Sequence, residues 1–271
     1  MAADDQAQPA EGGPAGATKD DSPREVFVEV VSSRSSRRQA ESQLTRLRKR
    51  VRGGRTAQRE EFGQIMEAAR QAAAADPRSL PSLINLFGRA AQSRAFTEVL
   101  RYGQDAAACD YMPEEVLFAP YAPLTADGRC FDDLRREVES PWRVRLGVDV
   151  ILPWPWSRER LLTSLSKLRP GGDWGDWRQD DNHRVELWLP IGVSWIYGGN
   201  HSITAGIINA AGEITPEVTY DISAVYDHVT CDGLDYRRAH DGSRIAPVAD
   251  LDIAVMFEIG RLMSTQPDAH G

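Results

Sequence analysis

The chain has 271 residues, of which 41% are hydrophobic and 27% charged, and its formal net charge is −8 at pH 7. These values are typical of a globular protein with one large domain or two small ones, and the negative charge argues against a protein that coats nucleic acid along its whole surface. No run of about 18 apolar residues and no signal-peptide pattern is present, so we expect no membrane association. The three cysteines, Cys109, Cys130 and Cys231, form no Cys-x-x-Cys pair, which predicts a reduced, cytoplasmic protein without a zinc knuckle or disulfide framework.

Two segments precede the first apolar pattern. Residues 1–23 are rich in Ala, Gly, Pro and Asp, and we expect them to be disordered. Residues 24–56 form a basic arm, in which Arg34–Arg55 carries nine basic residues against the single acid Glu41. Three apolar residues of the arm recur at helical spacing, Leu44, Leu47 and Val51. This pattern predicts a helix that ends at Gly53-Gly54.

The function of this basic arm has two interpretations. It could contact the phosphates of nucleic acid, and binding should then weaken steeply with salt because counterion release drives it. It could instead be a solvated helix that packs on the acidic remainder of the chain, since charge runs are common on ordinary surfaces. The two differ in whether Arg34–Arg55 is needed for affinity to a polyanion.

Residues 57–140 predict a helical region without evident chemistry. An apolar stripe ends before Pro77, and its members are Phe62, Ile65, Met66, Ala69 and Ala73. Two further helices are expected over residues 79–92 and 94–103, with Pro81 in a first turn and Gly103 at the end. Residues 130–139 predict a short amphipathic helix.

From residue 141 the pattern changes to strands that alternate with helices. Arg143–Pro153 predicts one strand, and Ser157 is expected to cap a helix whose apolar stripe is Leu161, Leu162, Leu165 and Leu168. A polar loop, Asp173–His183, follows. Residues 185–197 then alternate with period two, which predicts a strand that Pro190 and Gly192 kink or split.

The last part of this region, residues 198–263, continues the alternation. Gly198-Gly199 should break the strand, and a helix is expected from Asn200 until Gly212 closes it. Glu217–Asp227 predicts another strand, and Asp250 is expected to cap a final helix that ends at Met263. Residues 264–271 are expected to be a disordered tail.

Within the junction YGGNHSITAGI, Tyr197–Ile207, the segment Gly198–Ser202 places two glycines and three polar side chains where a strand passes into a helix. A helix N-terminus exposes unpaired N–H groups and a partial positive charge, and glycines let an anion approach the backbone. Asn200 or Ser202 could cap the helix, and His201 could donate to a phosphate or act as an acid or base. The alternative is a tight turn with Asn200 as its cap and an exposed His201 that has no role.

This junction resembles the turn of the ParB/sulfiredoxin-like superfamily, in which a strand ends in Gly-x-His-Arg or Gly-x-Arg-Arg before a helix, commonly with an alanine a few residues later. The residues that match are Gly198, Gly199, Asn200, His201 and Ala205. Upstream, VDVILPWPWSRERLLTSLSKLRPGG follows the family's order of strand, proline turn, helix and glycine, with Arg158 or Arg160 in the place of the family's arginine. The similarity covers about Val144–Tyr226, and it implies a mixed-sheet domain with a nucleotide or phosphodiester site.

Three departures narrow what this resemblance implies. Ser202 stands where family members carry a phosphate-gripping arginine, and Asn200 stands where sulfiredoxins carry the nucleophilic cysteine. Sulfinic-acid reduction is therefore not expected. No helix-turn-helix pattern follows the domain, so recognition of partition-site DNA is not expected either.

Two other clusters could carry chemistry. The loop from Asp173 to Glu186 holds oxygen ligands and one imidazole, His183, but lacks the compact spacing of a rigid metal cage, so we expect no metal site. Cys231 with His228 could suggest a thiol nucleophile, although a half-buried turn cysteine is the commoner case. The seven tryptophans could stack on bases, and core or loop packing is their commoner use.

Together these patterns predict an α+β protein, with an N-terminal helical region followed by a ParB/sulfiredoxin-like mixed-sheet domain over residues 141–263. We expect it to bind a nucleoside di- or triphosphate or a nucleic-acid backbone, through the Gly198–Ser202 turn and the Arg34–Arg55 arm. The expected phosphate-binding residues are Gly198, Gly199, Asn200, Ser202, Arg158 and Arg160, and His201 is the catalytic candidate if the protein is a hydrolytic enzyme. The alternative is a degenerate, non-catalytic domain that acts through protein–protein contacts, with the arm as a tether.

Overall fold

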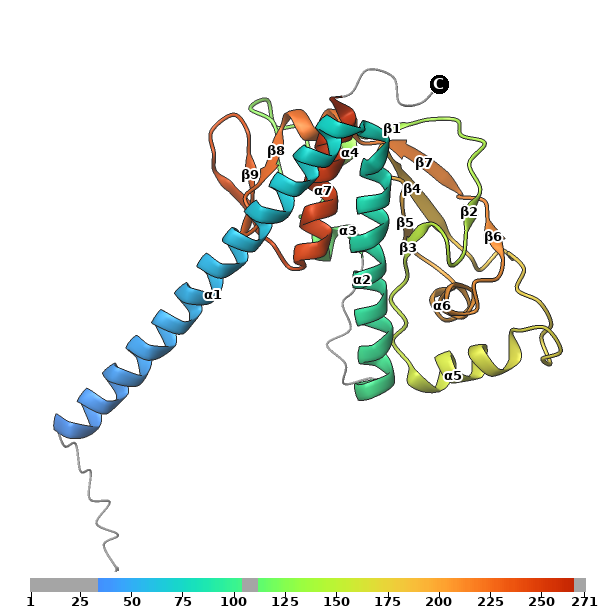
Figure 1. The fold of residues 1–271 in the computed structure, drawn as a ribbon, viewed down its shortest axis with the longest axis horizontal. Coiled ribbons are helices and arrows are strands. Elements are labelled where there is room, and N and C mark those ends of the chain that lie inside the picture. Colours follow the sequence, from blue (N-terminus) through green and yellow to red (C-terminus); the bar gives the residue numbers. More distant parts are fainter. Residues whose placement is uncertain (1–33, 104–111, 266–271) are drawn as a thin grey trace, which may run out of the picture. The chain divides into compact units, whose positions relative to one another are not determined.

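The computed structural model describes residues 34–103 and 112–265, with side chains from Gly54 onward except that of Glu115. The chain divides into two compact units, Met1–Arg48 and Lys49–Gly271, and the sheets lie in the second (Figure 1). Of the predicted disordered segments, 1–23 and 264–271, residues 1–23 and 266–271 lie outside the described residues, whereas Ser264 is the last residue of helix α7 (Leu251–Ser264), so the prediction is wrong there. Among the helices that the structure describes, none is long and apolar enough to span a membrane.

The first helix, α1 (Arg34–Ala75), is continuous through Gly53-Gly54, so the prediction that this glycine pair ends the basic helix is wrong. A glycine inside a helix costs only about 1 kcal/mol relative to alanine, and good helix formers stand on both sides of the pair. Phe62, Met66 and Ala69 are buried, which confirms the predicted stripe. The helix ends before Pro77, as expected, and a short 3-10 helix, η1 (Pro77–Ser79), follows.

The second helix, α2 (Leu80–Tyr102), is a single element rather than the two predicted. No helix breaker separates the two predicted segments, and Ala91 and Ala95 lie buried on one continuous face. Gly103 ends α2 with a positive φ of 65°, as predicted. Two single-turn helices follow in chain order, α3 (Pro113–Val116) and α4 (Phe131–Leu134).

The central sheet has five strands in the order β1-β7-β4-β5-β3. Their bounds are Arg136–Glu137 (β1), Val218–Asp221 (β7), Val185–Leu189 (β4), Val193–Ile196 (β5) and Val150–Leu152 (β3). The pairs β3–β5 and β4–β7 are parallel, whereas β4–β5 and β1–β7 are antiparallel, so the sheet is mixed. With the helices that precede it, the sheet gives the predicted α+β class.

Two smaller sheets complete the strands of the described chain. The antiparallel sheet β8–β9–β10 is formed by Val229–Cys231, Asp235–Arg238 and Arg244–Pro247. The pair β2–β6 joins Val144–Arg145 to Glu213–Ile214. The remaining helices are α5 (Arg158–Lys167), α6 (Asn200–Ile208), η3 (Ser223–Asp227) and α7 (Leu251–Ser264).

The period-two run over residues 185–197 is a hairpin of β4 and β5, which confirms the predicted split at Pro190 and Gly192. The hairpin pairs Trp188 with Val193, so an even position of β4 shares a face with an odd position of β5. Trp188 and Trp195 are both buried, at 1% exposure each. The odd-numbered apolar residues therefore lie on one face of the sheet in β4 and on the opposite face in β5, because the turn shifts the alternation by one residue.

Four predicted elements have different bounds. The strand predicted over Arg143–Pro153 is broken into β2 and β3 by Gly147, whose φ is 79°. The helix predicted to reach Gly212 ends at Ile208, the strand predicted over Glu217–Asp227 passes into η3, and residues 130–139 form one helical turn and then β1. Each boundary falls where the chain enters or leaves a sheet, which local propensity does not report.

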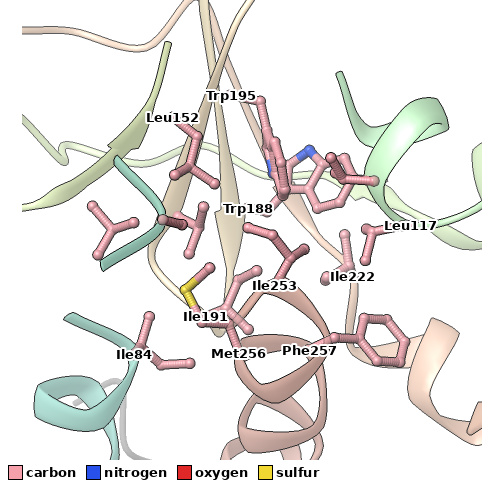
Figure 2. Close-up of a cluster of buried hydrophobic side chains, with 14 of the residues drawn as sticks. Ile84, Leu117, Leu152, Trp188, Ile191, Trp195, Ile222, Ile253, Met256 and Phe257 are labelled. Carbon is pink, nitrogen blue, oxygen red and sulfur yellow. The ribbon is translucent and has the colours of Figure 1, made fainter. Parts of the chain in front are cut away.

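The helical region and the sheet share one hydrophobic core (Figure 2). Ile253, Met256 and Phe257 of α7 face the indoles of Trp188 and Trp195 from the hairpin. α2 packs against both α7 and β3, and other core members come from separate segments: Ile84, Leu117, Leu152, Ile191 and Ile222. This packing holds the hairpin, and with it the β5–α6 junction, on a rigid base.

Candidate functional site

The glycine turn between β5 and α6 breaks the strand as predicted, but the cap of the helix differs from the prediction. Gly199 is the N-cap of α6 with a φ of 77°, and no side chain caps this helix. A Cβ atom on Gly199 would lie 2.4 Å from Cδ2 of His183, so the turn also needs glycine for close packing. Asn200 is not the cap: its Oδ1 accepts a hydrogen bond from the Trp154 backbone N–H at 2.9 Å.

Backbone donors are exposed at the start of α6 because no capping side chain covers them. The first bond of the helix runs from Ile203 N–H to the Gly199 carbonyl at 2.9 Å. The N–H groups of Asn200, His201 and Ser202 precede it and have no acceptor within the helix. The N-terminus of α6 therefore presents a partial positive charge to whatever lies in front of it.

The His201 imidazole is held by the N-terminus of α5. Its Nε2 accepts a hydrogen bond from the Ser157 backbone N–H at 3.1 Å, and its ring centroid lies 4.2 Å from that of Trp156. Burial and the nearby Arg160 lower the pKa of His201 to about 4. At neutral pH the ring is uncharged, so it has no positive charge to offer a phosphate.

A second imidazole, His183, lies behind the turn and was not predicted to belong to this site. It is buried, its Nε2 lies 2.6 Å from the Ser202 hydroxyl, and the Asp180 backbone nitrogen lies 2.9 Å from its Nδ1. The Ser202 hydroxyl oxygen also lies 2.9 Å from the Gly199 carbonyl oxygen, so its one proton has two acceptors in reach, and the tautomer of His183 decides between them. The hairpin register of the structure places His183 here: because Val185 pairs with Ile196, the residue two before Val185 stands opposite Gly198.

A cavity of about 710 Å³ opens where the N-termini of α5 and α6 meet. Its lining includes Ser157, which caps α5, then Glu159, Arg160 and Thr163 of α5, the turn from Gly199 to Ser202, and three indoles: Trp154, Trp156 and Trp174. A neighbouring cavity of about 540 Å³ shares Trp174, Asn182 and Ser202 with the first. Both volumes lie in the range of small-molecule sites.

The two candidate arginines of α5 lie differently. Arg160 lines the larger cavity, and its guanidinium carbon lies 4.8 Å from the centroid of the Trp156 ring. Arg158 donates to the Arg101 carbonyl at 2.7 Å and is not part of the lining. The structure therefore brings Arg160, Gly199, Asn200, His201 and Ser202 together around one cavity, while Gly198 packs behind the turn near Asn182 and Arg184.

Two further clusters of the sequence are the acidic loop Asp173–Asp181 and the pair Cys231 and His228. Among the described residues, no group of three His, Cys, Asp or Glu side chains could hold a metal ion. The absence of a metal site at the acidic loop Asp173–Asp181 stays a prediction, because calorimetry with Mg²⁺ or Mn²⁺ would be needed to test it. Burial raises the pKa of Cys231 to about 12, so this thiol is not a thiolate at neutral pH.

Comparison with known proteins gives one match. A family model with the description "Family of unknown function (DUF6710)" matches residues 46–269, which covers most of the chain. No curated protein and no solved structure matches.

Proposed function

The chain belongs to the DUF6710 family, and we propose that it binds a phosphate-bearing ligand, a nucleoside di- or triphosphate, in the cavity between α5 and α6. The observation that carries this proposal is the convergence of two helix N-termini and Arg160 on one cavity. Helix N-termini attract anions through their free N–H groups and partial positive charge. At α6 these N–H groups have no side-chain cap, whereas the Ser157 side chain caps α5. The uncapped start of α6 beside the Arg160 guanidinium favours a phosphate over a cation, and it does so in a lining that also holds the Glu159 carboxylate.

Backbone groups, rather than the polar side chains of the turn, form the cradle in this proposal. The side chains of Asn200, His201 and Ser202 already have partners within the protein. What remains for a phosphate is the set of N–H groups of the first turn of α6, together with the Arg160 side chain. The absence of an arginine at position 202 is then offset by Arg160, which reaches the cavity from α5.

A nucleotide, rather than free phosphate, is favoured by the indoles in the lining. Trp156 and Trp174 keep 40% and 53% of their surface exposed, although large aromatic side chains are usually buried. An exposed indole beside an anion site offers a face on which a base can stack. The resemblance to ParB/sulfiredoxin-like proteins, which use the same turn for nucleotides or phosphodiesters, supports the same ligand class.

A thermal-shift titration tests this function. Nucleoside di- and triphosphates, with and without Mg²⁺, should raise the unfolding temperature with ligand concentration, as mass action requires for a ligand that binds only the folded state. Inorganic phosphate should give a smaller rise because it cannot stack on an indole. If no nucleotide shifts the transition at millimolar concentration, the nucleotide site does not exist.

One observation favours a second function, a non-catalytic domain that acts through protein–protein contacts. Every polar side chain of the turn from Asn200 to Ser202 is satisfied internally, as expected for a turn with a purely structural role. In this case substitutions in the turn would change only the stability of the protein, because the turn would have no ligand-binding or catalytic role. Failure of the nucleotide titration, together with retained partner binding after Arg160→Met, would select this alternative.

For the basic arm we propose binding to a nucleic-acid backbone. Arg34–Arg55 lies within the single helix α1, and nine basic residues are present along it. Full-length protein with Arg46, Arg48, Lys49 and Arg50 changed to glutamine should lose most of its DNA affinity at low salt, with a smaller salt slope. The matched control changes Arg178 and Arg184, and unchanged affinity in the arm variant would contradict the proposal.

A further inference from the structure

Three side chains lie in line behind the cavity: a carboxylate, an imidazole and a hydroxyl. Asp180 Oδ1 lies 3.0 Å from Nδ1 of His183, and Nε2 of the same imidazole lies 2.6 Å from Oγ of Ser202. The imidazole is 7% exposed, and Ser202 is half-buried at the junction of the two cavities. A nucleophile within hydrogen-bond reach of a base that a third group orients is the arrangement used in covalent catalysis.

Asp180 can hold His183 in either tautomer. Its backbone N–H lies 2.9 Å from Nδ1 and can donate to an unprotonated Nδ1, whereas its carboxylate, at 3.0 Å, can accept from a protonated one. With Nδ1 protonated, Nε2 is free to accept the hydroxyl proton of Ser202. The hydroxyl has one proton and two acceptors in reach, and the imidazole at 2.6 Å is nearer than the Gly199 carbonyl at 2.9 Å.

We propose that Ser202 is a nucleophile with His183 as its general base and Asp180 as the positioning residue, and that the site hydrolyses carboxylic esters. This inference extends the proposed function from binding to chemistry, and it rests on that function only for the open cavity in front of Ser202. It assigns the proton transfer to His183 rather than to His201, whose Nε2 already accepts from the Ser157 backbone.

The reaction balances without a cofactor. Ser202 Oγ forms a bond to the acyl carbon while its proton passes to Nε2 of His183, and the imidazolium is held by the Asp180 carboxylate. The bond from the acyl carbon to the alcohol oxygen then breaks, and that oxygen takes the proton from Nε2. A water molecule repeats both steps on the acyl-serine, releasing the carboxylic acid and restoring Ser202.

The surroundings of Ser202 suit such a reaction. The free N–H groups of the first turn of α6 lie on the same turn as the nucleophile, where they can donate to the developing oxyanion. Burial lowers the pKa of His183, and the charge of Asp180 opposes this effect. The base is therefore in its neutral, proton-accepting form at neutral pH.

Covalent labelling with an alkyl fluorophosphonate tests the proposal on the full-length protein. The serine oxygen displaces fluoride from phosphorus and its proton goes to the base, so the adduct reports an activated hydroxyl without knowledge of the natural ester. Peptide mass spectrometry should find one adduct, on Ser202. His183→Gln should lower the labelling rate at least about 100-fold. The matched control is Ser166→Ala, because Ser166 also donates to a carbonyl of its own helix but has no imidazole beside it.

Asp180→Asn separates catalysis from a purely structural network. A structural network needs the Asp180 backbone N–H and the side-chain oxygen that accepts from the Asn182 N–H at 2.9 Å, and asparagine keeps both, so labelling and thermal stability would stay as in the wild type. The catalytic assignment predicts labelling about tenfold slower with the same unfolding temperature, a modest factor because Asp180 is largely exposed. No adduct on Ser202, or equal rates in wild type and His183→Gln, would overturn the proposal. Nucleotide thermal shifts in Ser202→Ala report the proposed function independently, so failure of one leaves the other measurable.

Discussion

The N-termini of α7 and α6 show two ways to complete the start of a helix. At α7 the Asp250 carboxylate accepts hydrogen bonds from the N–H groups of Asp252 and Ile253 at 2.9 and 3.3 Å, and Arg94 donates to its other oxygen at 2.6 Å. At α6 the N-cap is Gly199, which has no side chain, and a cavity lies in front of the free N–H groups. One helix start is closed by the protein's own anion, and the other is open.

A ligand at α6 would supply the oxygen anion that Asp250 supplies at α7. Asp250 supplies an oxygen anion to the α7 backbone, and Arg94 neutralises its charge. At α6 the arginine is present as Arg160, while no side chain caps the first N–H groups, and the nearby Glu159 carboxylate belongs to α5. A phosphate in the cavity would occupy, at α6, the position that the Asp250 carboxylate occupies at α7. The N-terminus of α7 therefore shows how an oxygen anion is bound at a helix start of this protein.

The largest effect is expected at the closed end. Asp250→Ala removes the cap of α7 and one partner of Arg94, and Asp250 is 8% exposed. We expect the free energy of unfolding to fall by about 2 to 4 kcal/mol, measured by urea denaturation. The control is Asp76→Ala, at the exposed cap of η1, where the loss should be about 1 kcal/mol or less. Equal losses of unfolding free energy in the two variants would show that the buried cap of α7 stabilises the protein no more than an exposed cap does.

The next effect is expected at the open end. Gly199→Val places a β-branched residue at a φ of 77°, with its Cβ against His183. We expect a loss of about 2 to 3 kcal/mol in unfolding free energy, with loss of nucleotide binding by calorimetry. Gly128→Val is the control, because Gly128 has a φ of 88° but nothing within 4 Å of the added atom. If Gly199→Val still binds nucleotide, the turn is not part of the nucleotide site.

A smaller effect is expected when the arginine of the open end is removed. Arg160→Met should weaken nucleotide binding about tenfold, near 1.4 kcal/mol, because a charge-assisted contact is lost. Stability should change by about 0.5 kcal/mol or less, since Arg160 is exposed. Arg158→Met is the matched control, since the Arg158 guanidinium donates to the Arg101 carbonyl. Equal binding by both variants would remove Arg160 from the site.

The smallest effect is a pH dependence. The pKa of His201 is lowered to about 4 in the folded protein, against about 6.5 in an unfolded chain. The unfolded state therefore binds the proton more readily between these values, and the stability linked to His201 is present above about pH 6.5 and is lost as the pH falls toward 4.

Comparison of the wild type with His201→Gln measures this linkage. Urea midpoints of the two proteins should converge as the pH falls from 7 to 4, because glutamine does not titrate. A difference that stays constant over this range would show that His201 has an ordinary pKa.

Local sequence patterns gave correct predictions where one residue has a strong backbone preference or an apolar period is long. Gly103 and Asp250 mark helix termini that the structure confirms, and Gly198-Gly199 ends the strand as predicted. The stripe of Phe62, Met66 and Ala69 was correct for the same reason, since a 3.6-residue period is read without knowledge of the partner. The split of the β-hairpin also followed from its proline and glycine.

Predictions failed where packing outweighs a local preference. Gly53-Gly54 does not end α1, because a weak breaker cannot stop a helix that has strong formers on both sides. Asn200 is a good capping residue by type, yet its side chain is taken by the Trp154 backbone. Such choices depend on which donor or acceptor lies nearest in space, and residues 46 positions apart in the chain are involved.

By itself, the sequence determined the α+β class, the glycine turn at the start of α6 and the apolar faces of the helices. These depend on φ preferences and on periodicity, which act between near neighbours in the chain. Only the tertiary structure decided that α5 brings Arg160 rather than Arg158 to the turn, and that the hairpin register sets His183 against Ser202. The physical reason is that a site is a set of distances between elements, and those distances are fixed by the packing of a shared core.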